Sequence, residues 1–140
     1  MTPENYISYK LLSSPTVASK IDGRAYNLFV PKAGSEFPFV VFRRGQTLNE
    51  NTVSAPGPIG LPVTTFFVSS WAETLADARA LGDAVRETLD GAIGNAAGVS
   101  IVSLQLTNEI DDYIDPSPTG AQLPLAYEIR HIYSVRWKRT

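Results

Sequence analysis

The clearest pattern in the sequence is an alternation of apolar and polar positions over residues 125–139. The apolar side of this alternation comprises Tyr127, Ile129, His131, Tyr133, Val135 and Trp137. A period of two over this length predicts a β-strand with one buried face. Residues 98–108 alternate in the same way. The β-branched and aromatic runs at 24–31, 37–45 and 63–71 predict three further strands, the first of them ended by Pro31.

A spacing of three and four predicts the main helix, over residues 74–90. Its apolar stripe comprises Ala78, Leu81, Val85 and Leu89. Thr74 and Asp77 have the spacing of a capping box, and Gly91 is suited to end the helix. A second, broken helix is expected over residues 3–20. It begins at Pro3, which is a favourable first helical residue.

This order of elements predicts an α+β domain with a mostly antiparallel sheet of four or five strands and two helices on one face. Residues 32–36 suit a hairpin loop between the first two strands. Residues 109–124 are expected to form an acidic loop between the last two. Residues 45–63 have no regular pattern and contain several prolines and glycines, so a loop that projects from the body is expected there.

The length and composition limit the classes of protein to which this chain can belong. A chain of 140 residues, 44% hydrophobic and 19% charged, is expected to form a single domain over 1–140 with its own core. Cysteine is absent, which excludes disulfides and thiolate metal sites. No apolar run reaches the ~20 residues that span a bilayer, and the first residues lack the features of a signal peptide. Synthesis in the cytoplasm is therefore expected.

No catalytic, cofactor-binding or metal-binding residue is predicted. The one histidine, His131, lies within an apolar strand face, so a core or interface role is favoured over that of a catalytic base. Asp111, Asp112 and Asp115 lack the glycine and the later glutamate of an EF-hand, and a solvated loop is favoured over a cation site. A non-enzyme is expected. A small enzyme or ligand-binding domain that uses this loop and His131 stays open as the alternative.

Short basic clusters suggest an interaction surface. They could contact phosphates or an acidic neighbouring subunit, and the net charge of −2 favours the subunit over nucleic acid. Two prolines of the projecting loop join the candidates. The predicted subunit or tube interface comprises Arg43, Arg44, Pro56, Pro58, Arg136, Lys138 and Arg139.

Several segments, taken in order, resemble the tail-terminator or tail-completion family of tailed bacteriophages. They are Gly23-Arg24-Ala25-Tyr26, Val30-Pro31, Phe37-Pro38-Phe39-Val40-Val41-Phe42, the strand ending Val68-Ser69-Ser70-Trp71-Ala72, the helix from Thr74 to Gly91, and Asp111-Asp112-Tyr113 ahead of the last strand. The joint pattern covers most of the chain. The sequence departs from the family pattern at 45–63, where members often have a shorter connection.

The resemblance implies a structural virion protein without a cofactor. Such proteins form rings, usually hexamers, at the head-proximal end of the tail tube, where they stop tube polymerisation and join the neck. The implied partners are further copies of the chain, the tail tube protein and a connector or neck protein. DNA would pass through the lumen without specific binding, no membrane is involved, and assembly would occur in the host cytoplasm. Gene transfer agents and tail-like particles carry similar proteins. A head–tail connector is the alternative role.

Overall fold

The computed structural model of the protein describes residues 3–27, 37–48, 63–113 and 126–139. Three helices and six strands lie within these ranges. In chain order they are α1 (Pro3–Ser13), α2 (Pro15–Ile21), β1 (Ala25–Asn27), β2 (Phe39–Leu48), β3 (Val63–Ala72), α3 (Leu75–Leu89), β4 (Gly94–Ala96), β5 (Val99–Tyr113) and β6 (Tyr127–Arg139).

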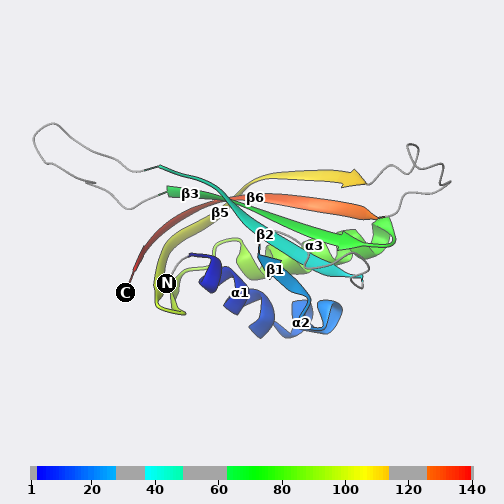
Figure 1. The fold of residues 1–140 in the computed structure, drawn as a ribbon, viewed down its shortest axis with the longest axis horizontal. Helices are drawn as coiled ribbons and strands as arrows, with labels where there is room; N and C mark the ends of the chain where they lie inside the picture. The colour runs from blue at the N-terminus through cyan, green and yellow to red at the C-terminus, as the bar shows by residue number, and fades with distance from the viewer. Residues whose placement is uncertain (1–2, 28–36, 49–62, 114–125, 140) are drawn as a thin grey trace, which may run out of the picture.

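The described strands form one sheet in the order β1-β2-β3-β6-β5-β4. β1 runs parallel to β2, and each of the other described pairs is antiparallel. All three helices lie on the same side of this sheet (Figure 1). The predicted α+β class is confirmed. The predicted four- or five-stranded, mostly antiparallel sheet with two helices is wrong, because the sheet is mixed and six-stranded and carries three helices.

β6 is a central strand of the sheet, between β3 and β5. Its alternating residues give it one buried face, as predicted. Ile129, His131, Tyr133 and Val135 are all buried on the side of the helices. The intervening residues point to the opposite side, which Figure 1 shows without a helix on it. This helix-free side is called the outer face. From β2, β3 and β6 it includes Val41, Arg43, Gly45, Thr65, Phe67, Arg130, Ile132, Ser134 and Arg136.

α3 begins as predicted and packs very closely on β6. The Thr74 hydroxyl accepts a hydrogen bond from the Asp77 amide at 3.2 Å, which satisfies one of the free donors of the first turn. A Cβ added at Gly82 would lie 3.0 Å from Ile129 Cγ2 and 3.4 Å from His131 Cε1. The missing side chain therefore lets the helix backbone approach the central strand. This close approach is the reason to place a glycine in mid-helix, at a cost of about 1 kcal/mol in helix propensity.

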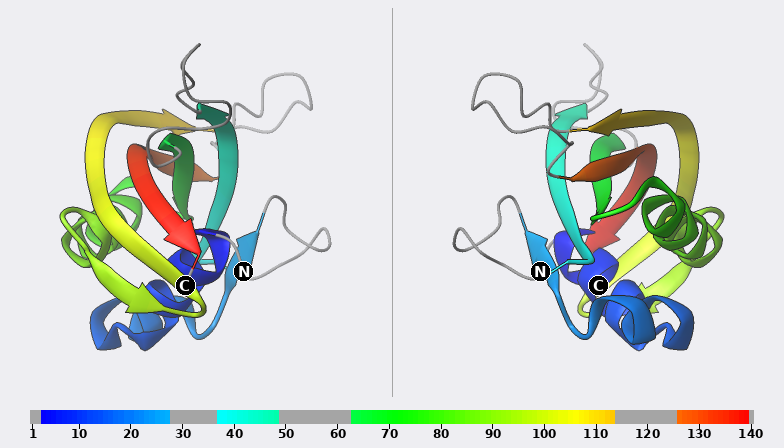
Figure 2. Two further views of the ribbon diagram at one scale, coloured as in Figure 1. Left: turned by 90° about the vertical axis from the view of Figure 1, so that its left-hand side faces the viewer. Right: turned by 90° about the vertical axis from the view of Figure 1, so that its right-hand side faces the viewer.

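The sheet curls around the helices, as the end views of Figure 2 show. α1 contacts both β1 and β5, which lie toward opposite ends of the strand order. Its Tyr6, Ile7 and Leu11 are buried in the same apolar cluster as the core face of β6. α1 therefore fills the space inside the curl and links the two ends of the sheet.

The parallel pairing of β1 corrects the predicted hairpin. Ala25 lies beside Val40 and Asn27 beside Phe42, so both strands run in the same direction. Because β2 runs parallel to β1, which has 3 residues, the chain must return from the end of β1 to the level of its start before β2 can begin. A tight hairpin loop cannot make this return, since it joins antiparallel strands. Residues 28–36, including the predicted loop at 32–36 and the predicted end of the strand at Pro31, lie outside the described residues.

Two strand boundaries and one additional strand also differ from the prediction. β2 continues to Leu48, so residues 45–48 belong to a strand and not to the irregular loop, whose residues 49–62 lie outside the described residues. β5 continues to Tyr113, so Asp111 and Asp112 pair with β6 instead of lying in a loop. β4 was not predicted. It joins β5 through a two-residue turn at Ala97 and Gly98, whose φ angles are 52° and 74°.

We expect Gly82→Val to destabilise the fold by about 1–3 kcal/mol, because the added methyl groups would overlap Ile129 and force α3 away from β6. The matched control is Ala80→Val, since Ala80 is exposed on the same helix and only helix propensity changes there. Chemical denaturation of both variants gives the comparison. Equal loss of stability in the two variants would show that the close approach at Gly82 has no energetic importance.

Candidate interaction surface

His131 is fully buried beneath α3 and is the first residue to test for chemistry. Its Nε2 lies 3.4 Å from Glu109 Oε1 of β5, and neither ring nitrogen forms a well-oriented hydrogen bond within the described residues. Burial lowers the pKa of His131 below its ordinary value, and the Glu109 carboxylate opposes this only in part. The ring is therefore neutral at pH 7, in agreement with the core role that the sequence favours.

The neighbouring buried polar groups do not complete a catalytic site. Tyr133 lies beside His131 with ring centroids 6.1 Å apart, and burial raises the pKa of its hydroxyl above the ordinary value. Ser70 on β3 is buried with a hydroxyl that has no partner in the described part of the chain. No hydrogen bond joins the side chains of Ser70, His131 and Tyr133, so these residues do not form the relay of a nucleophile and its base.

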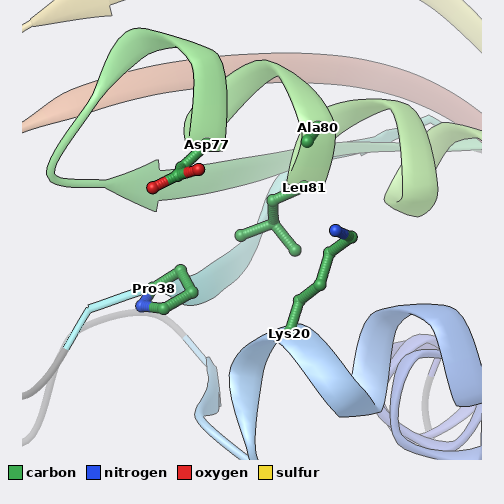
Figure 3. A pocket seen from close by; sticks show the side chains of 5 residues that line it. All are labelled: Lys20, Pro38, Asp77, Ala80 and Leu81. Carbon is green, nitrogen blue, oxygen red and sulfur yellow. The ribbon is translucent and has the colours of Figure 1, made fainter.

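Two hollows formed by described residues beside α3 are small for a ligand site, at about 110 and 120 Å³. The one in Figure 3 lies between α2 and α3 and measures about 110 Å³, with Lys20, Pro38 and Leu81 around it. Small-molecule pockets are commonly about 300–1,000 Å³. Among the described residues no group of acidic or histidine side chains could hold a metal ion. Within the same residues, no helix has the length and apolarity needed to cross a membrane.

A larger hollow of about 380 Å³ lies on the outer face, next to the irregularity in β2. Gly45, Gln46, Thr65 and Phe67 line it. A Cβ at Gly45 would lie 2.7 Å from the Phe67 ring, so the glycine makes room for this ring against β2. The Arg43 guanidinium in turn lies over the ring at 4.4 Å from its centroid, within the range of a cation–π contact. Phe67 thus holds Arg43 on the outer face.

The predicted basic residues divide between the two sides of the sheet. Arg43 and Arg136 lie on the outer face, both exposed, and Lys138 is exposed farther along β6. No carboxylate pairs with these three within the described residues. Arg44 instead lies on the helix side, where its guanidinium donates to both Glu4 carboxylate oxygens at 2.8 and 2.9 Å. That ion pair ties α1 to β2, so Arg44 is already occupied within its own subunit.

The other residues of the predicted interface are two prolines and Arg139. Pro56 and Pro58 lie outside the described residues, and Arg139 is the last residue of β6. On the outer face, Arg130 is neutralised by Glu128 through two hydrogen bonds of 3.2 and 3.0 Å. Among the described side chains, the positive charge of this face that has no acidic partner comes from Arg43, Arg136 and Lys138.

The apolar part of this face was not predicted from the sequence. Phe67 and Ile132 are neighbours across β3 and β6, and both are only half-buried. The adjacent pair Phe66-Phe67 was the available signal, since alternation in a strand must place one of two consecutive aromatic residues on each face. The outer face thus combines apolar side chains with unpaired cations, the composition of a protein contact surface.

Comparison with known proteins gives a consistent result. The model of the family described as tail completion protein gp17 matches residues 6–131. A solved chain from the "virion of native gene transfer agent (GTA) particle" has a similar structure, with a TM-score of 0.68, 17% identity, and coverage of 94% of this chain and 90% of that chain. At this identity the likeness establishes a shared fold. No curated protein matches the sequence at a significant level.

The burial of His131 predicts a specific pH dependence of stability. Because its folded pKa is lowered, the unfolded chain takes up the proton first as the pH falls below about 6.5. The contribution of the neutral His131 ring to the free energy of unfolding is fully present above that pH. It decreases on acidification, by up to about 1.4 kcal/mol at pH 5.5. Thermal melts at pH 7.5 and 5.5 should show a smaller loss for His131→Gln than for the parent. Identical losses in both proteins would contradict a neutral buried ring.

Proposed function

From the membership of this chain in the tail completion protein gp17 family, we propose that it is a ring-forming tail terminator of a tailed phage or a related particle. In this role it caps the head-proximal end of the tail tube, stops tube polymerisation and joins the tube to the neck. The observation that carries the proposal is the family match over residues 6–131, and the fold shared with a virion chain of a gene transfer agent particle supports it.

The surface of the molecule is suited to assembly rather than to chemistry. A hollow of about 380 Å³ lies on the helix-free outer face, beside an aromatic side chain and an exposed arginine. Contact through such a face can join like subunits, and a head-to-tail contact that closes on itself gives a ring. We expect a hexamer, with Arg43, Arg136 and Lys138 near the subunit or tube contact. Pro56, Pro58 and Arg139 stay in the same proposal, on the basis of the sequence alone.

The proposed role also involves the domain organisation, the partners and the place of assembly. One apolar cluster includes side chains from α1 to β6, which supports the proposal of a single domain over residues 1–140. The projecting loop near 45–63 stays a proposal from the sequence alone, since its residues 49–62 lie outside the described residues. The proposed partners are further copies of the chain, the tail tube protein and a neck protein. DNA would pass through the lumen without specific binding, a role compatible with a net charge of −2. Assembly in the host cytoplasm is proposed with it. The family and its structural relative concern virion proteins, and no enzymatic role is proposed.

We expect native mass spectrometry of the purified protein to show a closed oligomer, and negative-stain images to show rings. Added to the polymerising tail tube protein of its own particle, the protein should shorten the tubes in proportion to its concentration, because a capped end cannot grow. His131→Gln is the control and should act like the parent, since the buried ring is not at the surface. Rings that leave the tube length unchanged but bind the neck protein would favour the connector role instead.

A further inference from the structure

We propose that the outer face of the sheet is the docking site for α3 of a second copy of this chain. The contact is head-to-tail, with cations and apolar side chains of one subunit against carboxylates of the next. This inference rests on the proposed ring and identifies its subunit contact.

The outer face offers an apolar floor between unpaired cations. Phe67 and Ile132 are half-buried neighbours, and Arg43 lies over the Phe67 ring. Arg136 lies opposite Val63, which is four residues from Phe67 along β3. At about 3.3 Å per residue the two arginines are separated by roughly 13 Å along the strands. The face can therefore contact about two to three turns of a helix.

The exposed side of α3 has the complementary charge. Asp83 and Glu87 are one turn apart, exposed, and without a cationic partner among the described residues. The arginines of the same helix are already engaged with β5. Arg79 lies 3.1 Å from Asp111, and Arg86 lies 4.0 Å from Glu109. The helix therefore presents uncompensated negative charge to a partner.

The exposed side of α3 that carries Asp83 and Glu87 also has small side chains, which let a partner approach closely. Ala76 and Ala80 precede Asp83 at helical spacing and are exposed. Ala76 to Glu87 covers about 16 Å at 1.5 Å per residue, close to the length available between the arginines. A second copy is preferred over DNA as the occupant of the outer face, because the net charge of −2 opposes binding to phosphates whereas the acidic helix is present on every subunit.

The positions of the two surfaces require a head-to-tail arrangement. α3 lies on one side of the sheet and the outer face is the other side, as Figure 1 shows. Each subunit can therefore give α3 to one neighbour and its outer face to another. A contact between two different surfaces generates a ring when the rotation closes, and it cannot stop at a symmetric dimer.

Two charge-reversed variants of the full chain test the contact. The first is Arg43→Glu with Arg136→Glu, and the second is Asp83→Lys with Glu87→Lys. Each variant alone should lose assembly, with the dissociation constant weakened by about 100-fold, since like charges then face each other. An equimolar mixture should assemble again, because the acidic outer face of the first meets the basic helix of the second, and their unaltered surfaces also match. The readouts are native mass spectrometry and analytical ultracentrifugation.

The matched control is Asp22→Lys, which reverses an exposed charge at the end of α2 that belongs neither to the outer face nor to the exposed side of α3, and should assemble like the parent. Thermal melts of every variant establish that the monomers are folded, and the milder pair Asp83→Asn with Glu87→Gln should give intermediate assembly.

Rings that survive both reversals would overturn the docking proposal but leave the proposed function intact. A parent that stays monomeric at all concentrations would contradict both. Duplex DNA binding that the first variant abolishes while its rings persist would assign the outer face to DNA instead.

Discussion

The burial of one face of β6 beneath α3 is the constraint on which the rest of the structure depends. β6 pairs on both sides with long strands, so its inward face must be covered along its length. Gly82 lets the helix come within contact of Ile129 and His131, and this proximity leaves no room for a side chain at that position. The same contact buries the histidine as a neutral ring. Packing, and not catalysis, therefore explains the unusual environment of His131.

Covering one face of the sheet leaves the other free. Because the three described helices lie on one side, the outer face keeps half-exposed aromatic and aliphatic side chains together with arginines that have no acidic partner among the described residues. Free surfaces of this kind are stabilised when a partner removes them from water. The two-layer architecture thus places the basic and apolar outer face and the acidic side of α3 on opposite sides of one subunit. In the proposed ring, each subunit would use both surfaces for its head-to-tail contacts.

Arg43 and Arg44 show how strongly strand geometry separates adjacent residues. In a strand, consecutive side chains point to opposite faces. Arg43 therefore lies over Phe67 on the outer face, while Arg44 reaches Glu4 of α1 on the helix side. One is available to a partner, and the other holds the curled sheet around α1. In the sequence the two residues form a single basic pair, and their separate roles follow only from which face of β2 the helices cover.

The sequence by itself determined the elements whose periodicity is local: β6, most of β3, the extent of α3 with its Thr74 cap, and the break between the first two helices. It also carried the resemblance to the family. The tertiary structure alone decided the parallel pairing of β1, the extension of β5 through Asp112, and the turn at Ala97, where a positive φ falls on a residue that gives no turn signal. Periodicity shows which side chains share one face of a helix or strand, because that depends only on the local backbone geometry. Strand partners, strand ends and the covered face depend on residues distant in sequence, whose contacts form only when the whole sheet closes around its helices.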